Sequence, residues 1–335
     1  MNVGRAFVRP PPCMLPQQFR ASRVFAVSLF LCLASASVRA EGTGVPALPC
    51  AQPTPMTVAA PEPALPAPRI FNLAGSVPIV TMQPFAEFLI AMGYPEASLR
   101  DPRDGSLSTS SYTASEQLAG TIAWHYEKDG MRPMLIGHSQ GGMLVVRTLH
   151  ELVGAFNEQI PVYDPVADAA LPRTTIRDPY THAPRPVVGL DVSFAAALAT
   201  GALPRLLLGQ WTMLPKLRKI PDSTLAFTGF TVAWDPIAGN FGTGTPYVAL
   251  GTADVRNVTL PAAYSHIGLP ITEHLAANPV TRAWIDAYRP DAVPPVPDAP
   301  DVDVRNLLHA ADLWFSIRTH WCNEGQRRRA AEGSS

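Results

Sequence analysis

Residues 134–143 constrain the fold of this chain more than any other segment, because an apolar run passes there directly into glycine-rich residues. Residues 134–136 suit a buried strand, and residues 143–147 can open a helix. Between them, residues 137–141 match the pattern G-x-S-x-G, with Ser139 at its centre. A strand that turns straight into a helix strains the backbone of its apex residue, and side chains beside that residue would collide with either element. The sequence therefore predicts a sharp strand–turn–helix unit that holds the Ser139 hydroxyl clear of a sheet.

A serine hydroxyl in this position needs a base, because it is a poor nucleophile at neutral pH. Among the eight histidines, only His266 follows a strand-like run, residues 255–260, through a short loop. An imidazole there can take the serine proton and later return it to a leaving group. His138 lies inside the turn itself, where we expect it to pack beside the serine. The sequence thus predicts His266 as the base.

The third group should be a carboxylate that lies between the serine and the histidine in the sequence, at the carboxyl end of a strand. Asp235 fits this position, because it ends the β-branched and aromatic run of residues 225–234. Its carboxylate would accept the imidazole N–H, fix the tautomer and stabilise the imidazolium. Asp191, which follows the apolar run 186–190, is the main alternative. Asp254 is less suitable, because it precedes the last strand rather than ending one.

This order of serine, aspartate and histidine resembles that of the α/β-hydrolase superfamily, and within it the secreted bacterial lipases and esterases. The likeness covers residues 69–290, and its most specific part is the sequence GHSQGG at 137–142. The resemblance implies a mostly parallel sheet, reduced to about six strands, with flanking helices and an apolar cap or lid. It also implies an oxyanion hole made by the N–H of Gln140 and that of Ala74 or Gly75, in the loop after an early strand.

The cap or lid is expected in residues 193–221, between two predicted strands. Two apolar patches with a helical pattern, 194–199 and 206–214, are separated there by Gly201 and Pro204. The patches would either cover the core or form a lid and acyl-binding pocket above the serine. Four cations flank the patches and would either face anionic headgroups during a transient contact with a lipid surface or only keep the helix soluble: Arg205, Lys216, Arg218 and Lys219.

Residues 1–40 have the pattern of a signal peptide. Two arginines precede the apolar run 24–34, which is too short to span a bilayer as a helix, and small residues lead up to Ala40. Cleavage after Ala40 would export the protein to the periplasm or the exterior. Either Met1 or Met14 can be the start, since the stretch before the arginines is long.

Signal-peptide cleavage would leave two of the four cysteines, Cys50 and Cys322. Such a pair can form a disulfide in an oxidising compartment, and we expect this bond, with two free thiols as the alternative. The rest of the chain divides into a Pro/Ala-rich leader at 41–68, a catalytic domain at 69–290, and a terminal region at 291–335. That terminal region contains a Pro-rich linker, a helix and a basic tail.

Composition narrows the classes of function. The 335 residues are 47% hydrophobic, which is enough for one sizeable core, and the net charge of −1 argues against a nucleic-acid partner. The sequence contains no metal-ligand cluster, phosphate loop or dinucleotide fingerprint, so we expect no metal and no cofactor. We therefore expect an exported serine hydrolase that cleaves small-molecule or lipid esters. A thioesterase, amidase or acyltransferase on the same residues, or a non-catalytic binding protein, remains an alternative, and the oligomeric state stays open.

Overall fold

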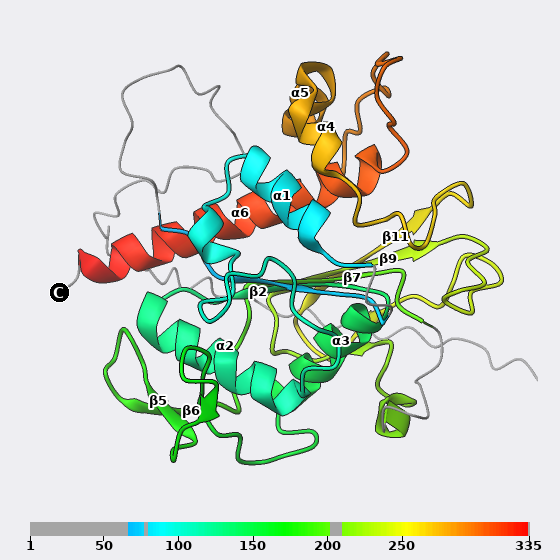
Figure 1. The fold of residues 1–335 in the computed structure, drawn as a ribbon. Coiled ribbons are helices and arrows are strands. Elements are labelled where there is room, and N and C mark those ends of the chain that lie inside the picture. Colours follow the sequence, from blue (N-terminus) through cyan, green and yellow to red (C-terminus); the bar gives the residue numbers. More distant parts are fainter. Residues whose placement is uncertain (1–65, 77–79, 202–209, 334–335) are drawn as a thin grey trace, which may run out of the picture. The chain divides into compact units, whose positions relative to one another are not determined.

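The computed structural model describes residues 66–76, 80–201 and 210–333, all within one unit that spans Ala47–Ser335 (Figure 1). The expected signal peptide and Cys50 lie outside the described residues, as does most of the Pro/Ala-rich leader. None of the helices in the described ranges is long and apolar enough to cross a membrane.

A parallel sheet of five strands forms the centre of the described chain, in the order β1-β2-β7-β9-β11. Every residue of the first three strands is buried, as expected for a parallel sheet that is covered on both faces. Thr109 adds an isolated parallel bridge to β1. The sheet therefore has five strands, where about six were expected. Their bounds are β1 (Ile70–Leu73), β2 (Met134–His138), β7 (Phe194–Leu198), β9 (Ala226–Val232) and β11 (Asp254–Leu260).

Helices cover both faces of the sheet (Figure 1). Alternate side chains of a strand point to opposite faces, so Met134 and Ile136 join one core cluster while Leu135 joins the other. The first cluster contains side chains of α1 (Gln83–Ala91), α4 (Glu273–Ala277), α5 (Pro279–Ala287) and α6 (Leu307–Glu332). The second contains side chains of α2 (Ser115–Asp129) and α3 (Gln140–Leu152). The sheet with its two helical layers has the architecture of an α/β-hydrolase.

Shorter elements connect these layers. Three two-stranded sheets pair β3 (Tyr163–Asp164) with β4 (Ala169–Ala170), β5 (Thr175–Arg177) with β6 (Pro184–Pro186), and β8 (Lys219–Ile220) with β10 (Val248–Ala249). The 3-10 helices are η1 (Glu96–Ser98) and η3 (Gln210–Met213).

The expected lid at 193–221 is wrong in its first part. Phe194–Leu198 form β7, a fully buried strand between β2 and β9. A short apolar run fits a buried strand and a buried helix equally well, so periodicity alone could not separate the two. Residues 202–209 lie outside the described residues, and Met213 of η3 is buried in the core rather than turned to a lid surface.

The expected basic tail is also wrong, because α6 continues to Glu332 and includes residues 327–329. Arg327 pairs at 2.5 Å with Glu324, whose buried carboxylate also pairs at 2.6 Å with Arg132 beside β2. The same helix packs its apolar side chains into the first core cluster. The carboxyl-terminal helix is thus part of the α/β domain, and it contains Cys322, the described half of the expected disulfide.

Candidate active site

Ser139 occupies the turn between β2 and α3, and it adopts φ 52° and ψ −115°. This left-handed backbone region is strained for a residue with a side chain. The neighbouring glycines have no room for one: a Cβ on Gly141 would overlap the carbonyl oxygen of Leu73, and a Cβ on Gly137 would overlap that of Gly141. The predicted strand–turn–helix unit is therefore confirmed, and its glycines let α3 start directly against the sheet.

Ser139, His266 and Asp235 form one hydrogen-bonded series. The Oγ atom of Ser139 lies 3.0 Å from Nε2 of His266, and Nδ1 of the same ring lies 2.6 Å from Oδ2 of Asp235. The three residues follow β2, β11 and β9, and strands of a parallel sheet end at one edge, where ligands bind. The structure thus brings together the three residues that the sequence singled out.

Asp235 is held in a fixed orientation. Its side chain is almost fully buried, and its Oδ1 atom accepts the backbone N–H groups of Ile237 at 3.0 Å and Ala238 at 3.1 Å. Burial raises the pKa of Asp235, but hydrogen bonds from His266 and these N–H groups outweigh burial and bring the pKa below its ordinary value. An ionised Asp235 accepts the Nδ1 proton of His266, which leaves Nε2 free to accept the Ser139 hydroxyl proton.

The two alternative carboxylates lie at the other edge of the sheet. Asp191 precedes β7, and Asp254 is the first residue of β11, so both are at amino ends of strands. The apolar run 186–190 that suggested Asp191 is not a strand of the central sheet. Neither carboxylate therefore lies at the edge of the sheet that carries Ser139.

The loop at 74–76 lies against Ser139. A Cβ built on Gly75 would lie 3.7 Å from the Cβ of Ser139 and 3.2 Å from Nδ1 of His138. The N–H of Ala74 donates to the carbonyl of Thr109 at 2.9 Å, so it is already used. The N–H of Gly75 donates in none of the described hydrogen bonds, so of the two loop positions it is the one available as an oxyanion donor.

Two side chains that the sequence did not single out anchor this loop. The hydroxyl of Ser111 donates to the Gly75 carbonyl, and that of Tyr112 donates to the Ser76 carbonyl, both at 3.0 Å. They lie 36 residues away in the chain, so no local pattern could have pointed to them.

His138 packs beside the catalytic candidates, as predicted. Its Nε2 N–H donates to the backbone carbonyl of His266 at 2.8 Å, and the two ring centroids are 5.1 Å apart. Burial, with a smaller effect from the neighbouring His266, lowers the pKa of His138 to about 3. A neutral His138 therefore holds the loop that carries His266.

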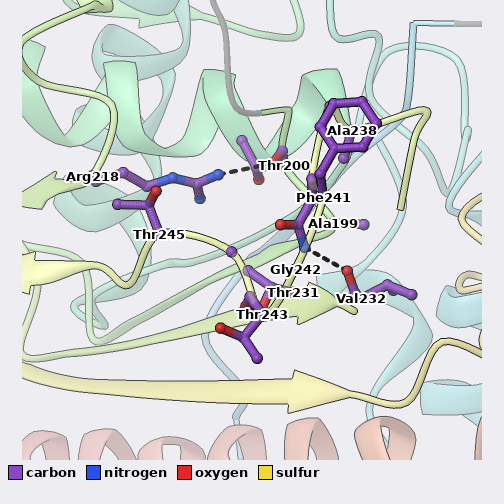
Figure 2. Close-up of a pocket in the computed structure, with 13 residues that line it drawn as sticks. Ala199, Thr200, Arg218, Thr231, Val232, Ala238, Phe241, Gly242, Thr243 and Thr245 are labelled. Carbon is purple, nitrogen blue, oxygen red and sulfur yellow. Dashed lines mark hydrogen bonds between the residues drawn. The ribbon is translucent and has the colours of Figure 1, made fainter. Parts of the chain in front are cut away.

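Two cavities lie beside this series. The smaller, of about 190 Å³, opens onto Ser139. Its lining residues are Ser139, Gln140, Met143, Gly201, Pro236, Ile237, Ala238 and Gly239. The larger, of about 380 Å³, shares Ala238 and Gly239 with it and is lined by residues 238–245 of the loop after β9 (Figure 2). In the described part of the chain, no cluster of three or more His, Cys, Asp or Glu side chains could hold a metal ion.

Comparisons with known proteins were made for the whole chain. No protein-family model matches it, and no curated protein matches its sequence. Among solved structures, it is similar to Aspergillus fumigatus lipase B, with 14% identity and a TM-score of 0.33 over 76% of this chain. It is also similar to RedJ with a PEG molecule bound in the active site, with 19% identity and a TM-score of 0.29 over 67% of this chain.

The matched regions cover different shares of the two known chains. They cover 63% of the lipase B chain, less than two thirds of its length, and 96% of the RedJ chain. At TM-scores below 0.5, neither similarity supports a statement about activity.

Proposed function

We propose that this protein is a serine hydrolase that cleaves carboxylic esters through an acyl-enzyme. The observation that carries this proposal is the hydrogen-bonded series Ser139–His266–Asp235, with distances of 3.0 and 2.6 Å. Nucleophile, base and orienting carboxylate within such distances are the constellation needed to activate a serine hydroxyl.

In the proposed reaction, Ser139 Oγ attacks the acyl carbon while Nε2 of His266 takes the hydroxyl proton. The imidazolium then donates this proton to the leaving alcohol, and the acyl group remains on Ser139 as an ester. A water molecule then gives a proton to the same nitrogen and attacks the acyl carbon. The imidazolium returns this proton to Ser139 Oγ as the bond between Oγ and the acyl carbon breaks, which releases the carboxylic acid and restores the serine hydroxyl. Asp235 stays ionised throughout and stabilises the imidazolium of His266.

The negative oxygen of each tetrahedral intermediate needs donors that are already in place. We assign this role to the backbone N–H of Gln140, at the start of α3, and that of Gly75 in the facing loop. The anchoring of the Gly75 and Ser76 carbonyls by two hydroxyls supports a fixed loop position. One donor of this kind typically contributes a factor of about 10²–10³ in rate.

The cavity at Ser139 favours a small ester with an apolar part. Met143, Pro236 and Ile237 contribute apolar surface to it, and Ile237 is 62% exposed. A volume of about 190 Å³ suits a short acyl chain better than a long one. We further propose that the protein acts after export, with cleavage near Ala40, which amino-terminal sequencing of the secreted form would test.

The test compares wild type with Ser139→Ala on p-nitrophenyl acetate and on the corresponding thioester and anilide. We expect hydrolysis of the oxygen ester by wild type and none above background by the variant, with closely similar melting temperatures. A fluorophosphonate should add one label to wild type, seen by intact mass, and none to the variant. Activity of Ser139→Ala within a few fold of wild type would remove Ser139 from the mechanism.

A further inference from the structure

The larger cavity lies at the same edge of the sheet as Ser139. It is bounded by Ala199 and Thr200, which directly follow β7, by the end of β9, and by the loop at 238–245. Figure 2 shows the side chain of Arg218 reaching into this region toward Thr200. The carboxyl edge of a parallel sheet is where ligands of such folds bind, so the position suits a substrate site.

Arg218 is a half-buried cation with no ion pair among the described residues. One guanidinium nitrogen, Nη2, donates to the carbonyl of Thr200 at 3.1 Å, while the buried Nη1 has no hydrogen-bond partner. Arg132 and Arg256, in contrast, each pair with a buried carboxylate. A partly buried charge without a counter-ion is costly, and a bound anion would offset that cost.

The neighbouring phenol does not supply the missing negative charge. The guanidinium carbon of Arg218 lies 4.5 Å from the ring centroid of Tyr247, which is fully buried beneath it. Burial raises the pKa of the Tyr247 hydroxyl, with the Arg218 charge acting in the opposite direction. Tyr247 is therefore neutral, and it presents a flat ring on which the guanidinium stacks.

The lining of the cavity also contains polar side chains from β9 and the loop at 238–245. It includes the hydroxyl-bearing side chains of Thr231, Thr243 and Thr245. The loop is held by the Thr231 hydroxyl, which donates to the Thr243 carbonyl at 3.0 Å, and by Asn240 Nδ2, which donates to the Val232 carbonyl at 2.6 Å. A cation in a cavity that Thr243 and Thr245 also line is a suitable site for a carboxylate, which accepts hydrogen bonds from guanidinium and hydroxyl groups.

The two cavities adjoin each other. Ala238 and Gly239 line both of them, and Thr200 lines the larger while the next residue, Gly201, lines the smaller. A substrate with its carbonyl at Ser139 would therefore occupy a cavity that shares wall residues with the cavity of Arg218.

We propose that the Arg218 cavity binds a carboxylate carried by the ester substrate, so that the preferred substrates are esters with a free acid group. The identification of the ligand as a substrate rests on the proposed function, whereas the anion site rests on Arg218 and its surroundings. The carboxylate has two possible places: on the acyl side, as in a half-ester of a dicarboxylic acid, or on the alcohol side, as in an ester of a hydroxy acid.

The first experiment measures kcat/KM for two series of esters at constant pH. The acyl-side series contains monomethyl succinate, glutarate and adipate, each compared with its dimethyl ester. The alcohol-side series contains acetyl esters of hydroxy acids, each compared with the corresponding amide. We expect wild type to prefer the charged member of one series by about 10- to 100-fold, as expected for one hydrogen bond to a charged group.

Arg218→Gln should bring that ratio of charged to neutral substrate close to one, mainly through KM of the charged ester. Arg177→Gln is the matched control, because Arg177 is exposed in β5, far along the chain, and also has no ion pair among the described side chains. This control should keep the wild-type ratio. A wild-type ratio near one in both series, or a preference that survives Arg218→Gln, would overturn the proposal.

The second experiment needs no catalysis and separates the two proposals. Calorimetric titration of wild type and Ser139→Ala with glutarate should show binding, with none for the neutral glutaramide or for Arg218→Gln. Glutarate binding in a protein without esterase activity would refute the proposed function and retain the anion site. Ester hydrolysis without glutarate binding would refute the anion site alone. Competition by glutarate against ester hydrolysis in wild type gives the same decision if Arg218→Gln does not fold.

Discussion

Asp235→Asn changes one atom and should remove nearly all of the proposed activity. The N–H groups of Ile237 and Ala238 need an acceptor, so the amide oxygen takes the place of Oδ1. The amide NH₂ group then faces Nδ1 of His266, which lies 2.6 Å from Oδ2 in the native site. Two donors cannot share this hydrogen bond, so His266 moves its proton to Nε2. That nitrogen then points an N–H at Ser139 Oγ and can no longer take its proton.

We expect kcat on p-nitrophenyl acetate to fall about 10⁴-fold, which corresponds to about 5 kcal/mol of transition-state stabilisation. The loss should appear in kcat rather than in KM, because the cavity at Ser139 is unchanged. Asp191→Asn is the matched control, since it makes the same substitution at the opposite edge of the sheet, and it should stay within a few fold of wild type. Thermal unfolding of both variants checks that the fold is intact. A folded Asp235→Asn protein within tenfold of wild type would refute the assigned role.

Three further predictions concern stability and covalent structure. Gly141→Ala places a methyl group on a backbone carbonyl, so urea unfolding should show a loss of about 1–3 kcal/mol. Gly325→Ala, inside α6 and with open space around it, should instead gain up to about 1 kcal/mol. Burial lowers the pKa of His309 to about 4, whereas an unfolded histidine titrates near 6.5. The free energy of unfolding should therefore fall as the pH decreases from about 6.5 to 4. His309→Leu should flatten this dependence in urea unfolding at several pH values. Non-reducing peptide mapping of the exported protein should recover a peptide that joins Cys50 and Cys322, and its absence would contradict the expected disulfide.

The candidate site could be predicted from the sequence because each of its signals is local. The glycines that flank Ser139 lie within three residues of it, and their lack of side chains lets α3 approach β1, β2 and β7 closely. Asp235 and His266 each follow a β-branched run that the structure contains as β9 and β11. Because parallel strands bring their carboxyl ends to one edge of the sheet, the residues that follow those strands meet there.

The lid prediction failed because its signal was ambiguous. The run Phe-Ala-Ala-Ala-Leu in β7 is apolar at every position, and only its place between β2 and β9 makes it a strand. Ala197 has a neighbour that the sequence alone does not show: Gly142 of α3 comes so near that a Cβ on it would lie 3.3 Å from the Cβ of Ala197. Arg218 was likewise expected to face a lipid surface. In the structure it contacts Thr200 and Tyr247, which are distant in the sequence, and its side chain lines a cavity.

The loop that follows β9 links the proposed chemistry to the proposed selectivity. At the start of this loop, one carboxylate oxygen of Asp235 accepts the N–H of His266, and the other accepts the backbone N–H groups of the next turn. Asn240 then closes the turn, because its N–H donates to the Asp235 carbonyl at 2.8 Å while its side chain holds the Val232 carbonyl. The residues between them, Ala238 and Gly239, line both cavities. The loop cannot change shape at one cavity without moving the groups that orient Asp235. If both proposals hold, this one rigid loop would contact both ends of the substrate, and the side-chain amide and carboxylate groups that fix its turn would keep the two cavities in register.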